Sequence, residues 1–189
     1  MKSIDLKSLL ITEKNIDLLK KNDQLAWNIK RLLDVDIDQS QSIRFGNMFQ
    51  NFIKSVVIEA GGNVLTQQFA DIYGVGETKS NKGQKDVDIW FNYGDKMYYF
   101  EAKTNLDLDS EKSKATDQKV SAISDWMKTT YPDCEVVFGI LSCWFTKEPG
   151  LPVKVKNVFF MQDLFNLLDI KISAEEYYQI MKDFGKMIK

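Results

Sequence analysis

Apolar residues recur every three or four positions in the first third of the chain, which is the spacing of amphipathic helices. Residues 12–33 follow this spacing and predict either one helix or two shorter ones. An acidic connection over residues 34–42 comes next, and Ser42 is expected to cap a second helix that runs to residue 60. Gly61-Gly62 should end that helix.

The pattern changes from helical spacing to alternation after the glycine pair. Residues 63–69 predict a short strand, and residues 74–85 a polar loop that carries several lysines. Apolar and polar residues then alternate over residues 86–91, the turn-forming stretch Asn92-Tyr93-Gly94-Asp95 follows, and residues 97–103 predict a second strand. Together these features predict a β-hairpin.

The second half of the chain returns to a helix and then a long apolar run. We expect a charged loop over residues 106–113, a helix over 114–130, and a strand over 135–144 that is buried on both faces. The middle of the chain therefore has the order helix, strand, strand, strand, helix, strand. Beyond it we expect a short strand over 158–161, a helix near Leu164, and a last helix that Ser173 and Glu176 open as a capping box.

Composition limits the class of protein. The 189 residues are 44% hydrophobic and 28% charged, as in soluble globular proteins, and predict one domain over residues 1–189. The formal net charge of −2 means that binding to a nucleic acid would need a local basic surface. Short apolar runs broken by charges near the N-terminus fit neither a secretory signal nor a membrane span, so we expect a cytoplasmic protein without a membrane partner.

The absence of histidine restricts the chemistry that the chain can perform. It excludes Ser-His-Asp and Cys-His catalysis, histidine zinc sites and imidazole bases. Cys134 and Cys143 are the only cysteines, and we expect buried thiols rather than a disulfide or a zinc site. Catalysis would have to use carboxylates, lysine, hydroxyls and a hard metal ion.

The hairpin brings such groups together. Asp86 and Asp88 share one face of the first strand, as Glu101 and Lys103 do on the second. A turn centred on Tyr93-Gly94 pairs Asp86 with Glu101, and one centred on Gly94-Asp95 pairs Asp88 with Glu101. Either register puts all four polar residues on one face.

Three clustered carboxylates repel one another unless a cation lies between them, and oxygen ligands suit Mg²⁺, for which Mn²⁺ can substitute. A neighbouring lysine can orient the attacking water and stabilise charge on phosphate oxygens. The sequence thus predicts a metal-dependent hydrolytic site with Asp86, Asp88 and Glu101 as ligands and Lys103 beside them.

These residues resemble the motif of the PD-(D/E)XK nuclease superfamily, which includes most type II restriction endonucleases. The superfamily places an aspartate at the start of one core strand and Glu/Asp-x-Lys on the next. Here Asp88, or alternatively Asp86, precedes Glu101-Ala102-Lys103, although no proline precedes either aspartate. The resemblance implies an α/β, restriction-endonuclease-like αβββαβ core with a mixed central sheet over residues 42–144, with helical additions over 1–41 and 145–189.

The function implied by the resemblance is Mg²⁺-dependent endonucleolytic cleavage of double-stranded DNA. The chain would be a type II restriction endonuclease, or the nicking or cleavage subunit of one, acting as a homodimer or with a second nuclease subunit. A Holliday-junction or DNA-repair nuclease of the same superfamily is the alternative within enzymes. A non-catalytic DNA- or protein-binding domain is the alternative from another class.

The resemblance also suggests accessory residues. Gln50, in Gly46-x-x-Phe49-Gln50, stands where many members carry a helical glutamate. Lysines on both sides of the motif are candidates for phosphate contacts, and nearby amides are candidates for reading base edges. The lysines are Lys79, Lys82, Lys85, Lys112, Lys114 and Lys119, and the amides are Asn81, Gln84, Asn105 and Gln118.

Overall fold

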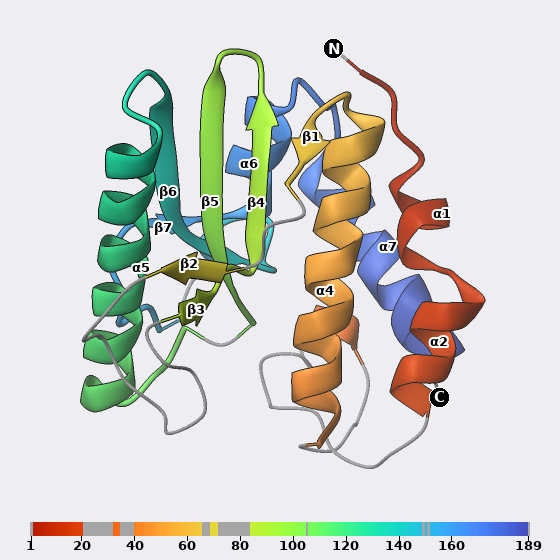
Figure 1. Cartoon of the computed structure of the whole chain (residues 1–189). Coiled ribbons are helices and arrows are strands. Elements are labelled where there is room, and N and C mark those ends of the chain that lie inside the picture. The colour runs from red at the N-terminus through yellow and green to blue at the C-terminus, as the bar shows by residue number, and fades with distance from the viewer. Residues whose placement is uncertain are drawn as a thin grey trace.

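A computed structural model gives the fold as an α/β arrangement of a five-stranded mixed open sheet flanked by helices (Figure 1). The structure describes residues 2–20, 32–34, 40–65, 69–71, 84–104, 106–148, 150 and 152–188. At residues 20, 40–43, 69–71 and 84–86 the description covers the backbone alone. The predicted α/β class is confirmed.

The five strands lie in the order β1-β4-β5-β6-β7. β1, β4 and β5 are antiparallel neighbours, whereas β6 runs parallel to β5 and β7 runs parallel to β6. The sheet is therefore antiparallel on one side and parallel on the other. The strand bounds are β1 Asn63–Val64, β4 Ile89–Tyr93, β5 Lys96–Lys103, β6 Glu135–Ser142 and β7 Val158–Phe159.

The β4–β5 hairpin settles which of the two expected registers is present. Ile89 pairs with Phe100 and Tyr93 with Lys96, so the turn is Gly94-Asp95. Gly94 has a φ of 62°, a left-handed conformation that glycine adopts without strain. Continuing this register by one residue places Asp88 opposite Glu101.

The first hairpin strand is shorter than predicted. Its pairing with β5 begins at Ile89, and residues 84–86 form a separate strand, β3 (Gln84–Asp86), which pairs with β2 (Phe69–Asp71) in a two-stranded sheet. The expectation of one continuous strand from Asp86 to Phe91 is wrong, as is the expectation of a loop at 84–85. The chain leaves the main sheet at Val87-Asp88, where it forms a bend.

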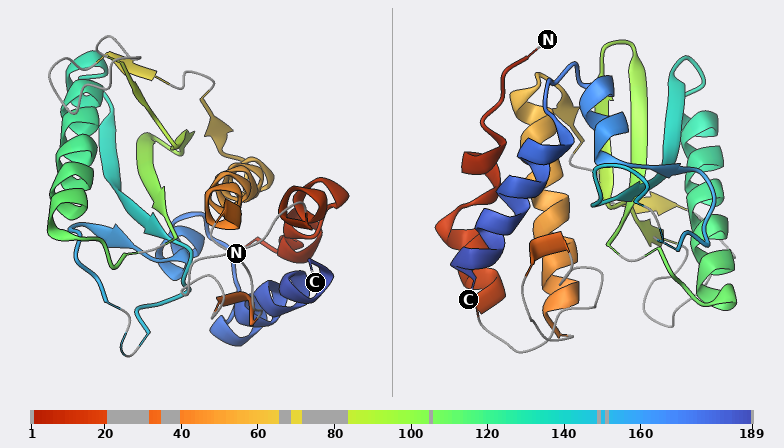
Figure 2. Two further views of the ribbon diagram at one scale, coloured as in Figure 1. Left: turned by 90° about the horizontal axis from the view of Figure 1, so that it is seen from below. Right: turned by 180° about the vertical axis from the view of Figure 1, so that it is seen from behind.

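Helices cover both faces of the sheet. Figures 1 and 2 show α5 (Ser110–Thr130) on one side and α4 (Ser40–Glu59) on the other, with three further helices beyond α4. α6 (Met161–Leu167) follows β7. The outer helices are α1 (Leu6–Leu10), α2 (Glu13–Lys20) and α7 (Ala174–Met187).

Several helices begin at other residues than predicted. α5 begins at Ser110, where the Asp109 carboxylate accepts a hydrogen bond from the Lys112 N–H at 2.8 Å. Ser42 lies inside α4 and does not cap it. α1 was not predicted, because its five residues are too few to show helical spacing.

Other helix ends agree with the sequence. Gly61 (φ 84°) ends α4, and Tyr131 caps the C-terminus of α5. α7 opens with the expected capping box, in which Ser173 and Glu176 exchange hydrogen bonds. The predicted helix over residues 12–33 is observed from 13 to 20 and at 32–33, and the residues between lie outside the described ones.

The two faces of the hairpin differ in character. On the side of α4, the rings of Phe91 and Tyr98 stack with centroids 4.9 Å apart, and Phe100 meets Phe159 edge to face at 5.0 Å. On the side of α5, Trp90 packs edge to face against Trp126 at 5.8 Å. The aromatic packing of alternate residues confirms the predicted period of two.

The N-terminal segment is tied to the end of the chain. Lys2 bridges to Ile170 in parallel, and its ammonium donates to the Ala60 carbonyl and, at 2.8 Å, to the Tyr93 hydroxyl. Tyr93 in turn donates to the Leu168 carbonyl at 3.1 Å. One lysine side chain thus joins the end of α4, the sheet and the turn after α6.

The two cysteines lie in different environments. Cys143 is fully buried, and burial raises its pKa to about 12, whereas Cys134 is exposed, so the expectation of two buried thiols is wrong for Cys134. Both are free, as expected. Among the helices in the described part of the chain, none combines the length and the apolar character needed to cross a membrane.

Candidate active site

Glu101 lies at the centre of a group of charged side chains beneath α5. Its carboxylate is 4% exposed, and both of its oxygens are paired. Oε1 accepts from the Lys103 ammonium at 2.9 Å, and Oε2 accepts from the Lys119 ammonium at 2.6 Å and from the Tyr99 hydroxyl at 3.3 Å. A carboxylate this deeply buried requires such partners, because an unpaired charge in the core is strongly unfavourable.

Asp88 completes the group from the bend that precedes β4. Its Oδ2 accepts the backbone N–H of Ala102 at 3.0 Å, and its Oδ1 lies 4.0 Å from the Lys119 ammonium. The bend between β3 and β4 therefore sets the Asp88 carboxylate against the backbone of β5. The predicted meeting of Asp88, Glu101 and Lys103 on one face of the hairpin is observed.

The two carboxyl groups have opposite pKa shifts. Burial, followed by the negative charge of Glu101, raises the pKa of Asp88 to about 6. Burial alone would also raise the pKa of Glu101, but the ammonium groups of Lys103 and Lys119 more than offset it, so its pKa lies below the ordinary value. Glu101 therefore stays ionised near neutral pH, whereas Asp88 takes up a proton as the pH falls through about 6.

Burial and the Glu101 charge also shift the pKa values of Lys103 and Tyr99. Burial lowers the pKa of Lys103, but the Glu101 carboxylate raises it further, for a net increase above the ordinary value. Burial raises the pKa of Tyr99 well above its ordinary range, and Glu101 adds to this. Both groups therefore remain protonated at neutral pH and act as hydrogen-bond donors.

Asp86 is not placed with the other three by the backbone. It lies in β3 and pairs with Phe69 of β2, so it belongs to the small sheet rather than to the hairpin. The prediction that Asp86 and Asp88 share a face of one strand is wrong, because the strand is interrupted between them. The side chain of Asp86 lies outside the described part of the structure.

Of the accessory residues that the structure describes, Lys112, Lys114 and Gln50 are not brought to the group. Lys112 pairs with Asp109 at the start of α5, and Lys114 is exposed on the same helix. Gln50 is half-buried on α4, and within the described residues no hydrogen bond joins it to Asp88, Glu101 or Lys103. Lys79, Lys82, Asn81 and Asn105 lie outside the described residues, as do the side chains of Gln84 and Lys85.

Lys119 and Tyr99 are the residues whose roles the sequence did not indicate. Lys119 was expected only to flank the motif and meet phosphates, yet it contacts both carboxylates directly. A signal was present: Lys119 stands next to Val120 and one turn before Ile123, on the buried stripe of α5. A lysine at the edge of such a stripe needs an anionic partner in the core.

The donor set is suited to a hard divalent cation. Mg²⁺ is commonly held by one or two carboxylates, with waters and substrate phosphate oxygens completing its coordination. Asp88 and Glu101 supply two carboxylates that a single ammonium group reaches. Among the residues whose side chains are described, no cluster of three or more acidic, histidine or cysteine side chains that could hold a metal ion occurs.

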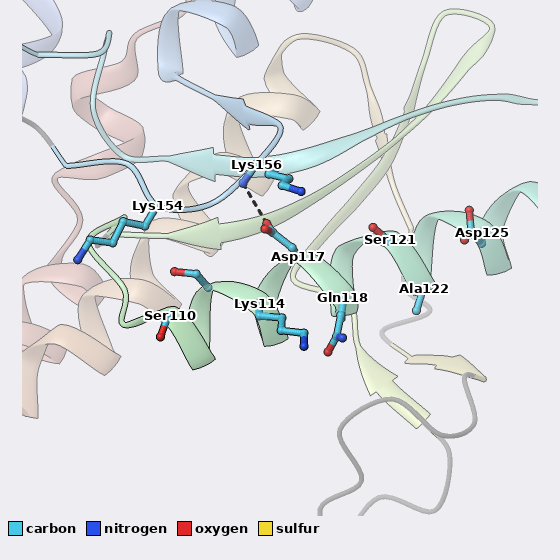
Figure 3. A pocket seen from close by; sticks show the side chains of 10 residues that line it. Ser110, Lys114, Asp117, Gln118, Ser121, Ala122, Asp125, Lys154 and Lys156 are labelled. Carbon is cyan, nitrogen blue, oxygen red and sulfur yellow. Dashed lines mark hydrogen bonds between the residues drawn. The ribbon is translucent and has the colours of Figure 1, made fainter.

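A groove lies elsewhere, between α5 and the segment before β7 (Figure 3). It has a volume of about 1180 Å³ and carries lysines on both of its walls, Lys114 on α5 and Lys154 and Lys156 on the segment before β7. The Asp117 carboxylate crosses it to accept the Lys156 N–H at 3.0 Å (Figure 3). None of the four charged residues of the carboxylate group lines this groove.

Comparison of the chain with protein-family models, with curated proteins and with solved structures gives no match.

Proposed function

We propose that this chain is a metal-dependent nuclease that hydrolyses phosphodiester bonds of double-stranded DNA. The observation that carries the proposal is the meeting of Asp88, in the bend before β4, with Glu101 of β5 around the Lys119 ammonium, with Lys103 bound to Glu101. An acidic pair and a lysine in this arrangement match the chemistry of Mg²⁺-assisted phosphoryl hydrolysis. The absence of histidine from the sequence is consistent with it.

The order of elements around the group supports the same proposal. α4, β1, β4, β5, α5 and β6 follow one another, apart from the inserted β2–β3 pair, and the four strands are adjacent in the sheet. This is the αβββαβ order that the resemblance to PD-(D/E)XK nucleases implies. Glu101 and Lys103 lie on β5, and Asp88 directly precedes β4, which supports the same resemblance.

Each residue has a definite task in the proposed reaction. Asp88 and Glu101 hold the cation, and the Ala102 N–H fixes the Asp88 carboxylate. Lys103, protonated at neutral pH, orients the attacking water and donates to a phosphate oxygen as negative charge builds up there. Tyr99 donates to Glu101 and fixes its rotamer. When bound, a divalent cation supplies Lewis-acid polarisation of the phosphate and activation of water.

The finer assignment within nucleases is a type II restriction endonuclease or the cleavage subunit of one. It rests on the sequence resemblance, and a Holliday-junction or repair nuclease is the alternative. Two copies of the chain, or one copy with a second nuclease subunit, would bring two such sites to the two strands of a duplex. Discrete fragments from DNA of varied sequence would distinguish restriction from non-specific or junction-specific cleavage.

A non-catalytic binding domain is favoured by one observation. Both oxygens of Glu101 already have ammonium partners, so the group is electrically satisfied without a metal ion. In that case the ion pairs of Glu101 with the two lysines would only stabilise the fold. Removing the lysines would then affect folding but no reaction.

Cleavage of supercoiled plasmid DNA with Mg²⁺, Mn²⁺ or EDTA tests the proposal. We expect nicked or linear product only with the metal, and none from Glu101→Gln or Lys103→Ala. Glu135→Gln and Lys96→Ala are matched controls. These two residues form an exposed ion pair between the first residues of β5 and β6, at the opposite end of β5 from Glu101. Equal activity in Glu101→Gln and Glu135→Gln would overturn the proposed site, and no cleavage under any metal would favour the binding domain.

A further inference from the structure

Lys119 occupies the position between the two carboxylates that the proposed function gives to a cation. Its ammonium is 2.6 Å from Glu101 Oε2 and 4.0 Å from Asp88 Oδ1. Lys103, in contrast, donates to Glu101 Oε1, and among the described residues it has no ion pair with Asp88. Of the two lysines, Lys119 alone forms ion pairs within 4.0 Å of both acids among the described residues.

The oxygens that remain for a metal ion follow from these contacts. Asp88 Oδ2 is held by the Ala102 N–H, so Oδ1 is the oxygen of this residue that faces a cation. Glu101 Oε2 is the oxygen that shares the Lys119 ammonium with it. A divalent ion that uses both oxygens would have to displace Lys119, whereas the contact of Lys103 with Oε1 could persist.

From this geometry, and resting on the proposed function, we infer that Lys119 is an intramolecular competitor of the divalent cation. Its ammonium neutralises the carboxylate pair in the metal-free protein, and metal binding releases it. The lysine is 21% exposed in its side chain and sits on a flexible four-carbon stem, so it can withdraw without unfolding α5. Metal affinity is thereby set lower than the two acids alone would give.

Electrostatics gives the direction of this effect. A positive charge a few ångströms from the site opposes a second cation, and binding must also break a short charge-assisted hydrogen bond. In return, Lys119 relieves the repulsion between Asp88 and Glu101 when the metal is absent. The same residue therefore weakens metal binding and stabilises the metal-free fold.

Titration of the intact protein with Mn²⁺ in the absence of DNA tests the inference, with unbound Mn²⁺ measured by electron paramagnetic resonance. We expect Lys119→Met to bind Mn²⁺ about tenfold more tightly than the unmodified chain, which is 1.4 kcal/mol. Metal-free Lys119→Met should unfold at a lower temperature, and saturating Mn²⁺ should raise its unfolding temperature more than that of the unmodified chain. Lys119→Gln carries the same expectation if Lys119→Met does not fold.

Two controls separate a local contact from a general effect of charge. Lys114→Met removes the same charge from the exposed side of α5 and should leave Mn²⁺ affinity within about twofold. Lys119→Arg keeps the cation and should bind Mn²⁺ no more tightly than the unmodified chain. Unchanged or weaker binding by the two neutral variants, or an equal gain in Lys114→Met, would overturn the inference while leaving the proposed function intact. If neither the unmodified chain nor any variant, Asp88→Asn included, bound Mn²⁺, both the inference and the proposed function would be overturned.

Discussion

The two faces of the β4–β5 hairpin carry alternate residues of the same short segment, yet they are stabilised in different ways. The face toward α4 holds Phe91, Tyr98 and Phe100 in ring contact, and these side chains need no specific partner atoms. The face toward α5 holds Asp88 and Glu101, which are tolerated only through named donors. Contacts on the apolar face stabilise the fold. The polar face instead buries charged groups, which lowers the stability of the fold unless each charge is paired.

The largest expected effect comes from the polar face and concerns activity. Asp88→Asn should lower the rate of DNA cleavage by about 10⁴-fold, or roughly 5.5 kcal/mol of transition-state stabilisation, because a ligand charge is lost. The measurement is single-turnover cleavage at saturating Mg²⁺. Asp95→Asn, in the exposed turn of the same hairpin, is the control and should cleave normally. A loss below tenfold would remove Asp88 from the proposed site.

The apolar face should show the converse. Phe100→Ala removes a ring that is fully buried between Phe91 and Phe159 and should cost about 3–5 kcal/mol of unfolding free energy. Urea denaturation gives the value, and Phe160→Ala, which replaces a half-exposed ring, should cost distinctly less. Similar losses in the two variants would mean that the ring contacts of this face contribute little.

A smaller effect is expected at Gly139, which pairs with Phe100 across β5 and β6. A Cβ at this position would lie 2.5 Å from the Asn157 carbonyl oxygen and 2.6 Å from the Phe159 ring, so Gly139→Ala should cost about 1–3 kcal/mol. Gly46→Ala on α4 is the matched control: it meets nothing within 4 Å and should stabilise the helix by roughly 0.5–1 kcal/mol. Thermal unfolding of both variants should therefore shift in opposite directions.

The smallest effect is a pH dependence of stability in the metal-free protein. The pKa of Asp88 is about 6 in the fold against an ordinary 3.8, so the folded state binds this proton more tightly than the unfolded state. Its contribution to stability is greatest below about pH 4 and is lost as the pH rises through about 6. Asp88→Asn should therefore gain stability relative to the unmodified chain between pH 4.5 and 7.5.

Unfolding in EDTA across this pH range measures the difference. Asp109→Asn is the control, because the Lys112 N–H lowers the pKa of Asp109 and its carboxyl is ionised in both states throughout the range. The stability difference for Asp109→Asn should therefore stay nearly constant. A parallel trend in the two variants would show that Asp88 is not the group responsible.

The sequence predicted the hairpin turn and the meeting of Asp88 with Glu101, because a period of two and a short turn leave little freedom. Residues 92–95 allowed two registers, both of which brought Asp88 to the face of Glu101, and the observed one pairs them directly. It misplaced Asp86, because nothing in the alternation marks the bend at which the chain leaves the sheet. Alternation reports which side a residue faces, but not where pairing with a neighbour ends.

The features that escaped prediction depend on contacts between distant segments. The tie of Lys119 to Glu101 joins a helix to a strand, and the periodicity of either element alone does not reveal it. The earlier start of α5 depends on Asp109 as its cap in a stretch where several acidic residues compete for that role. Helix periodicity and charge, taken together, indicate that Lys119 needs an acidic partner.

The tie made by Lys2 has a consequence for how the chain is synthesised. Lys2 donates its N–H to the Asp169 carbonyl and accepts from the Lys171 N–H, so its partners are translated long after it. These two backbone hydrogen bonds can therefore form only after residues 169–171 have been synthesised. The contact of the Lys2 ammonium with the Ala60 carbonyl joins residues that are much closer in sequence, so the C-terminal end of α4 can be bound by Lys2 before the bridge to Ile170 exists.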